Sequence, residues 1–223
     1  MVDSGSATLP PGRAAGVVLG LCAVGSVILL LNHPGGAAHS FLEVLKSEAD
    51  NQGSDAAVHG GFVVAMAVEY VCFAVLAARL GLGRIAVLEA MIFTAIGFAA
   101  MTGSMILDGL VTPAVAAKYL TAPPARVEEA RGLLVLISTL IRFLMPMGLG
   151  FQAAGVIGWG AALLSRDRAA KIVGAVGLAV GAGLLLALAA TYSELNPIVL
   201  MAGIAAIALW NLAAGLLLAL RKV

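Results

Sequence analysis

The sequence has very little charge. Only 11% of its 223 residues are charged, whereas a soluble domain carries roughly a quarter. Hydrophobic residues make up 61% of the chain. This composition excludes an ordinary soluble domain. It predicts an all-α, polytopic membrane protein that is embedded in the lipid bilayer. The formal net charge of +1 gives no basis for binding nucleic acid.

Cysteines and recognisable enzyme motifs are also scarce. Cys22 and Cys72 each lie inside an apolar stretch, so we expect buried thiols rather than a disulfide framework. The GxSxG, HExxH, P-loop and CxxC motifs are absent. The sequence therefore leans against an enzyme, although a membrane hydrolase or transferase that uses Asp108 and His59 stays open as an alternative.

Six apolar stretches are long enough to cross a bilayer as helices. We expect spanning helices at about 14–32, 58–80, 84–111, 125–165, 170–191 and 197–220. Residues 1–13 are expected to form a short flexible tail, and 14–223 a single domain. The first stretch resembles a secretory signal, but 14–31 is longer than the usual 7–15-residue core, which favours a membrane helix.

The loop after the first helix contains the start of another helix. Ser40 followed by Glu43 is a capping box. Phe41, Val44 and Leu45 would then form the apolar side of a short amphipathic helix at the membrane surface. We expect this helix to end within 51–54.

Three prolines predict helix starts or a kink. Thr112-Pro113 looks like an N-cap and first helical residue, which predicts a new short helix over 113–120. Asn196-Pro197 predicts the start of the last helix in the same way. Pro146 should kink the long fourth helix, because a proline cannot donate to the carbonyl of Arg142.

The basic residues predict the orientation in the membrane. One side carries Arg13, Arg79, Arg84, Arg166, Arg168, Lys171, Arg221 and Lys222. The other side carries Lys46, Lys118, Arg126 and Arg131 mixed with acidic residues. We therefore expect an inner-membrane protein with both termini in the cytoplasm.

The third spanning stretch carries polar residues on one face. Glu89 lies near its first end and Asp108 near its second. At 100° per residue, one stripe contains Thr94, Gly97, Met101, Ser104 and Asp108. A small, polar stripe in a membrane helix usually faces other helices or a cavity. We expect this face to point toward other helices or a cavity, and any functional site on this helix to lie at its Asp108 end.

Charged residues at membrane depth suggest a binding site. Glu69 and Arg142 should both lie near the membrane centre, and Arg142 has Glu69 and Asp108 as candidate partners. The expected site, between the second, third and fourth spanning helices and open to the outer side, comprises Asp108, Arg142, Glu69, Ser104 and Gln152. It would bind or transport a small molecule or ion. The alternatives are an ion pair that only fixes helix register, and an accessory subunit in a homo-oligomer or larger membrane complex.

The three histidines, His33, His39 and His59, all fall on the expected outer side. Imidazole beside carboxylate suits a divalent metal ion. Their spacing matches no compact metal motif, so solvated or capping histidines are the alternative interpretation. Because none of them lies deep in the membrane, we expect no haem and, the metal ion apart, no cofactor.

Overall fold

The computed structural model describes residues 11–33, 40–191 and 196–223, apart from the side chains of Pro11 and Pro124. These residues form helices and no strand. Six helices are long and apolar enough to cross a membrane, so the predicted fold class is confirmed. His39 and most of the predicted tail lie outside the described residues. The helices are α1 (Pro11–Leu31), α2 (Phe41–Asp50), α3 (Gln52–Leu80), α4 (Ile85–Ile106), η1 (Leu107–Val111), α5 (Thr112–Tyr119), α6 (Pro124–Leu163), α7 (Arg168–Ala190) and α8 (Pro197–Ala219).

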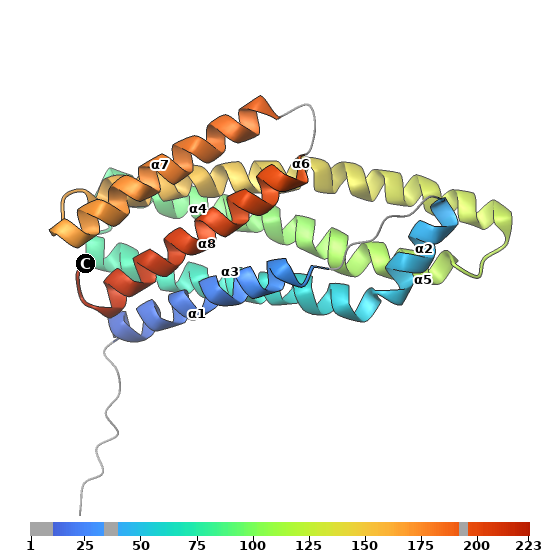
Figure 1. Cartoon of the computed structure of the whole chain (residues 1–223), viewed down its shortest axis with the longest axis horizontal. Helices are drawn as coiled ribbons and strands as arrows, with labels where there is room; N and C mark the ends of the chain where they lie inside the picture. Colours follow the sequence, from blue (N-terminus) through green and yellow to red (C-terminus); the bar gives the residue numbers. More distant parts are fainter. Residues whose placement is uncertain (1–10, 34–39, 192–195) are drawn as a thin grey trace, which may run out of the picture.

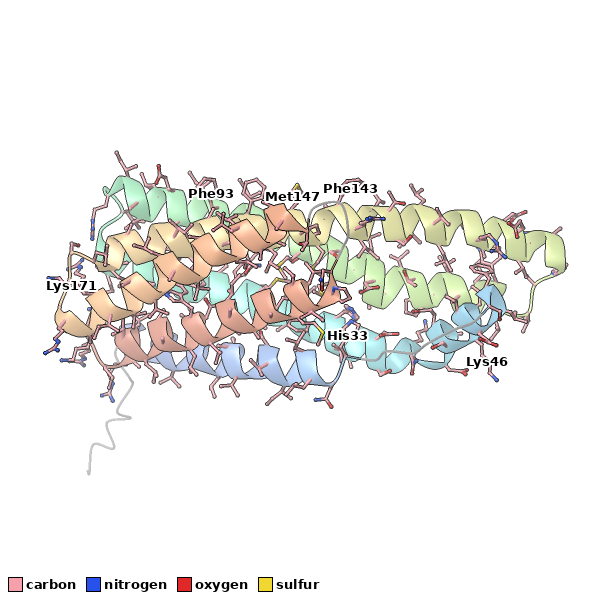
Figure 2. The ribbon with its side chains drawn as sticks, turned by 45° about the horizontal axis from the view of Figure 1, so that its top comes forward. His33, Lys46, Phe93, Phe143, Met147 and Lys171 are labelled. Carbon is pink, nitrogen blue, oxygen red and sulfur yellow. The ribbon has the colours of Figure 1, made fainter. Side chains whose placement is uncertain are left out.

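The molecule is an elongated helical bundle with an extension at one end (Figure 1). Helix α1 has 21 residues and rises about 32 Å, close to the thickness of a hydrocarbon core. Helix α6 has 40 residues and rises about 60 Å. Helices α3 and α5 accompany α6, so that these three helices extend beyond the ends of α1 and α8 (Figure 1). Helix α2 lies against this extension. Lys171 lies near one end of the long axis, and Lys46 lies on the extension toward the other end (Figure 2).

Stacked aromatic rings lie at the centre of the bundle. The Phe73 ring stacks on Trp159 and Trp210, with centroid distances of 5.3 and 6.4 Å. The Trp159 indole donates a hydrogen bond to Thr94 Oγ1 at 3.2 Å. The Trp210 indole donates to the carbonyl of Val173 at 3.1 Å. Both indole N–H groups are thus satisfied inside the apolar core.

The polar stripe of α4 faces inward, as predicted. Thr94, Gly97, Met101 and Ser104 are all buried, whereas Glu89 is exposed. Helix α4 contacts α6 at backbone distance, because a Cβ at Gly97 would lie 2.9 Å from the carbonyl oxygen of Gly148. Small residues are what allow membrane helices to pack this closely.

The other glycine-rich helices pack within the chain. Gly16 of α1 contacts Gly215 of α8, Gly177 of α7 lies against the Trp210 indole, and Gly181 lies against the backbone of α6. These glycines, which an accessory subunit could use for docking, are therefore occupied by neighbouring helices of the same chain.

The structure corrects the predicted start of the second spanning helix. Helix α3 begins at Gln52 rather than near residue 58. Asn51 caps the C-terminus of α2, and its carbonyl also accepts the first hydrogen bond of α3, from the Asp55 N–H at 2.9 Å. Asp55 in the first turn favours a helix N-terminus. A single residue thus separates two helices where a loop was expected.

The predicted N-cap at Thr112 is also wrong, although the expected short helix is present as α5. Helix α4 continues through the π-turn η1 into α5 without an N-cap. The Thr112 hydroxyl instead donates to the carbonyl of Leu107 at 2.9 Å. Pro113 has no N–H for the carbonyl four residues earlier, and a π-turn accommodates this defect without ending the helix. Helix α6 likewise continues through Pro146.

Two predicted helix starts are confirmed. The Ser40 side chain accepts a hydrogen bond from the Glu43 N–H at 3.3 Å at the start of α2. The Asn196 side chain accepts from Ile198 and Val199 at the start of α8. Helix α2 buries Leu45 in a small cluster with Ala116, Tyr119 and Ala130. This cluster fixes α2 to the extension formed by α5 and α6.

The close contact between α4 and α6 can be tested with alanine. Gly97→Ala and Gly148→Ala should each lower the free energy of unfolding by about 1–3 kcal/mol, because the new Cβ forces the two backbones apart. Gly183→Ala is the control, since a Cβ at Gly183 meets no atom within 4 Å. Unfolding in a denaturing-detergent titration measures the difference. Equal stabilities of all three variants would contradict the proposed role of the contact.

Candidate metal centre

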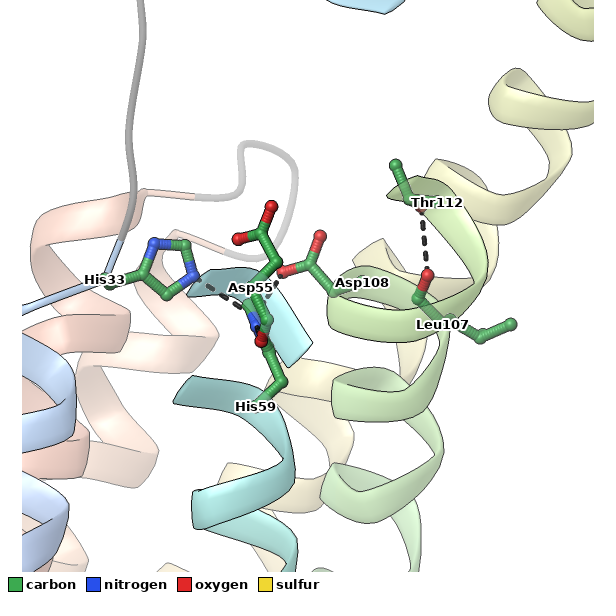
Figure 3. A network of polar contacts seen from close by, with 6 residues as sticks. All are labelled: His33, Asp55, His59, Leu107, Asp108 and Thr112. Carbon is green, nitrogen blue, oxygen red and sulfur yellow. Dashed lines mark hydrogen bonds and ion pairs between the residues drawn. The ribbon is translucent and has the colours of Figure 1, made fainter. Parts of the chain in front are cut away.

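Three side chains from distant parts of the chain meet at one end of the bundle (Figure 3). His33 follows α1, His59 lies in α3 and Asp108 lies in η1. His59 Nε2 is 3.2 Å from His33 Nε2 and 3.2 Å from Asp108 Oδ2. One potential ligand atom from each residue lies within 4.8 Å of the other two. Two imidazoles and a carboxylate thus converge on one point.

The main chain fixes the orientation of the His59 ring. His59 Nδ1 is 2.9 Å from the carbonyl oxygen of Asp55, one helical turn earlier. Because a carbonyl can only accept, Nδ1 carries the hydrogen and donates it. In the neutral ring Nε2 is then unprotonated and presents its lone pair to His33 and Asp108. Histidines that bind metal ions are commonly held by such a hydrogen bond.

A glycine in η1 allows Asp108 to reach His59. A Cβ at Gly109 would overlap Cβ, Cγ and Nδ1 of His59, so only glycine permits this approach. The hydroxyl of Thr112 closes the π-turn by bonding Leu107 (Figure 3). Single π-turns inside α-helices often occur at functional sites. Here the π-turn carries both the carboxylate and the glycine that lets it approach α3.

The three side chains differ in exposure. The His59 side chain is 3% exposed and the Asp108 side chain 38% exposed, while His33 is exposed. From His59 to Leu80, α3 rises about 32 Å, the thickness of a hydrocarbon core. The cluster thus lies about one hydrocarbon thickness from the other end of α3, and its His33 and Asp108 side is exposed at the surface of the molecule.

Further acidic groups surround the cluster. Asp55 is buried, and its carboxyl group lies near His33 and Asp108 in Figure 3. Glu48 of α2 is half-buried nearby. Burial, followed by the charges of Asp55 and Asp108, raises the pKa of the Glu48 carboxyl, while His59 lowers it. Three carboxyl groups around two imidazoles favour a cation at this position.

This geometry supports two kinds of chemistry. With a proton on Nε2, His59 is an imidazolium paired with the Asp108 carboxylate. With a metal ion, all three residues direct lone pairs at the same centre. Tetrahedral zinc with bonds of 2.0–2.1 Å separates its ligand atoms by about 3.3 Å. The two spacings from His59 Nε2, to His33 and to Asp108, are 3.2 Å each and match this value. The ligand atoms of His33 and Asp108 lie within 4.8 Å of each other.

The other residues of the predicted site lie elsewhere in the bundle. Glu69 is buried and accepts a hydrogen bond from Asn211 of α8 at 3.1 Å. Gln152 is buried and donates to the sulfur of Met101 at 2.6 Å. Ser104 is fully buried, and its hydroxyl has no hydrogen-bond partner among the described residues. Asp108 alone belongs to the cluster at the bundle edge.

Arg142 does not pair with Glu69 or Asp108 among the described residues. It is exposed and contributes to a groove of about 360 Å³ between α6, α7 and α8. The expected ion pair of Arg142 rested only on its depth in the membrane. Depth does not say in which direction a side chain points from α6. Phe143 beside it is also exposed and points outward (Figure 2), so Arg142 lies on an outer side of α6.

Two residues that position the cluster, Asp55 and Gly109, were not identified from the sequence. Asp55 was assigned to a loop, so its carbonyl could not be recognised as the acceptor for His59. Gly109 was included in an ordinary helix. The segment Asp108-Gly109 before Thr112-Pro113 carried a signal, since a glycine and a proline so close together often mark an irregular helical turn.

No protein-family model, curated protein or solved structure matches the chain.

Gly109→Ala should displace the His59 ring, because the new Cβ and the ring would occupy the same space. We expect His59, protected in the wild type, to react with diethyl pyrocarbonate in this variant, as measured by mass spectrometry. Gly103→Ala is the control, since its Cβ would meet only Leu144 at 3.5 Å. Equal reactivity of His59 in both variants would show that Gly109 is not needed for the approach.

Replacing Glu48 should change stability in a pH-dependent way. Because its pKa is raised on folding, the carboxyl ionises in the unfolded chain at lower pH than in the folded protein. Ionisation therefore destabilises the fold as the pH rises through that interval. In chelator-treated protein, Glu48→Gln should be more stable than the wild type at neutral pH, and the difference should vanish below the ordinary carboxyl pKa.

The control for this experiment is Asp50→Asn, which removes a carboxylate from the exposed end of the same helix. Thermal unfolding across the pH range compares the two variants. A gain of equal size for Asp50→Asn, or a gain for Glu48→Gln that persists in acid, would rule out burial at Glu48 as the cause.

Proposed function

We propose that this integral membrane protein binds a divalent metal ion, zinc by its ligand set, through His33, His59 and Asp108. The observation that carries the proposal is the convergence of these ligand atoms within 4.8 Å. The hydrogen bond from His59 Nδ1 to the Asp55 carbonyl supports it, because it leaves Nε2 available for a metal ion. Nitrogen and carboxylate ligands suit zinc.

The proposed centre has three protein ligands and an exposed side. Zinc sites of this kind keep a fourth position for water or substrate, whereas structural sites are usually closed by four protein ligands. When bound, the ion would lower the pKa of that water and polarise a carbonyl or phosphoryl oxygen. His59 would anchor the ion from the buried side, and Asp108 would supply the negative charge.

The cluster's side of the membrane follows from the basic residues. The eight at the opposite end are Arg13, Arg79, Arg84, Arg166, Arg168, Lys171, Arg221 and Lys222. By the positive-inside rule that end is cytoplasmic. We therefore place the metal centre at the outer face of an inner membrane. A metal ion or substrate would then reach it from outside the cell.

Transport of the ion through the bundle is a second candidate. A cavity of about 30 Å³ is lined by Glu69 and Gln152, and Glu69 lies about 15 Å along α3 from His59. This cavity is large enough for one water molecule and too small for an organic solute. It therefore favours movement of an ion or a proton over transport of a small molecule.

An accessory role in a larger complex has weaker support. The glycines of α1 and α7 that would form a docking face are in contact with α6 and α8. A role as subunit would therefore have to use another surface.

Metal binding can be measured directly on purified protein. Chelator-treated wild type should take up one Zn²⁺ or Co²⁺ per chain in a calorimetric titration. His59→Ala, His33→Ala and Asp108→Asn should each weaken binding by at least about 100-fold, because loss of a ligand exceeds the 10–100-fold effect of an outer-shell change. Glu128→Gln is the control, since it removes a carboxylate near the start of α6 whose side chain is 70% exposed.

A wild type that takes up neither ion would refute the metal centre, as would normal binding in His59→Ala and Asp108→Asn. Zn²⁺ uptake into sealed vesicles separates the two candidates. A protein that binds without transporting gives saturable binding and no uptake above that of empty vesicles.

A further inference from the structure

A second polar site lies in the middle of the bundle, about 15 Å along α3 from His59. Its central residue, Glu69, is 4% exposed and lies about halfway along the spanning part of α3. Asn211 Nδ2 donates a hydrogen bond to Glu69 Oε2 at 3.1 Å. An acid at this depth requires either a counter-cation or a proton.

No counter-cation is available within the described part of the chain. Glu69 forms no ion pair with any described lysine, arginine or histidine. The residues of α4, α6 and α8 that line the cavity beside it are uncharged. The charge of Glu69 acts on the thiols of Cys22 on α1 and Cys72 on α3. Neither thiol can supply positive charge, so an ionised Glu69 would be an isolated buried charge.

The side-chain amide of Asn211 also has an unsatisfied group. Asn211 is 3% exposed, and its Oδ1 has no hydrogen-bond partner among the described residues. An ionised Glu69 can only accept hydrogen bonds and would leave this oxygen unsatisfied. A protonated Glu69 adds an O–H donor. Acid and amide are then complementary, because each can donate one hydrogen bond and accept one.

The cavity beside this pair can hold a water molecule next to the acid. Its volume of about 30 Å³ is sufficient for one water molecule. Besides Glu69 and Asn211, polar side chains from Gln152 and Ser26 line it. A water molecule there would have the two to four polar partners that buried water requires.

We propose that Glu69 is a proton-binding site in the membrane core, with Asn211 as the partner of its neutral acid form and the adjacent cavity as its water position. The ligand is a proton. The proposal stands on the burial of Glu69, the unsatisfied Asn211 oxygen and the cavity, and it is independent of the metal centre. A proton carrier at this depth is what coupled movement of an ion would need.

A hydrophobic carbodiimide tests the protonation state on the wild-type protein in vesicles. The reagent takes up the acid proton on one nitrogen while the carboxyl oxygen bonds to its central carbon, and the adduct rearranges to a stable N-acylurea. A buried protonated carboxyl reacts at neutral pH, whereas an ionised, exposed one does not. Mass spectrometry should find the adduct on Glu69 and none on exposed Glu89.

Infrared spectroscopy then tests the partner. The wild type should show a protonated-carboxyl C=O band at neutral pH that is absent in Glu69→Gln. In Asn211→Leu this band should move to higher frequency, because the acid loses its hydrogen-bonded amide. Glu89→Gln is the control and should leave the band unchanged. A merely structural role of Asn211 would not move the band of another residue.

Three results would overturn the proposal. The first is the absence of carbodiimide labelling at Glu69 in the folded wild type, which needs no variant. The second is an unchanged carboxyl band in Asn211→Leu. The third is labelling that Na⁺ suppresses at constant pH, which would show that the carboxylate holds a metal cation instead of a proton. None of these results depends on whether His59 binds zinc.

Discussion

Close approach of helix backbones at glycine is the constraint on which this structure depends. In lipid, helices gain little by hiding apolar side chains, so contact at short distance must hold them together. Gly97 with Gly148 and Gly16 with Gly215 bring pairs of helices to backbone distance. Gly109 applies the same principle at the bundle edge, where it brings η1 against His59. The candidate metal centre is thus a consequence of helix packing.

The buried polar groups at the edge of the bundle differ in kind from those in its middle. At the edge, the cluster around His59 is partly exposed and combines imidazoles with carboxylates. In the middle, the described residues give Glu69 only the amide of Asn211 and uncharged neighbours. Desolvation is far costlier there than at the edge. The two sites therefore suit different ligands, a metal ion where water can exchange and a proton where it cannot.

The sequence predicted the features that depend on local chemistry. Six apolar stretches gave the spanning helices, and Ser40 and Asn196 gave two helix starts, because hydropathy and capping act over a few residues. It failed where geometry involves several elements. The continuous helix through Pro113 needs a π-turn that no simple periodicity reveals. The outward position of Arg142 depends on the rotation of α6, and the meeting of His33, His59 and Asp108 depends on how three helices pack.

The irregular backbone at the cluster suits reversible binding of an ion. His59 lies in a regular helix, and its ring is fixed by the Asp55 carbonyl. His33 lies just beyond the end of α1, and Asp108 lies in a π-turn and is partly exposed. One candidate ligand is therefore buried and held by a hydrogen bond, while the other two are more exposed and lie where the backbone departs from the α-helix. In the proposed site an ion would dock against His59 from the exposed side, where the other two candidate ligands lie.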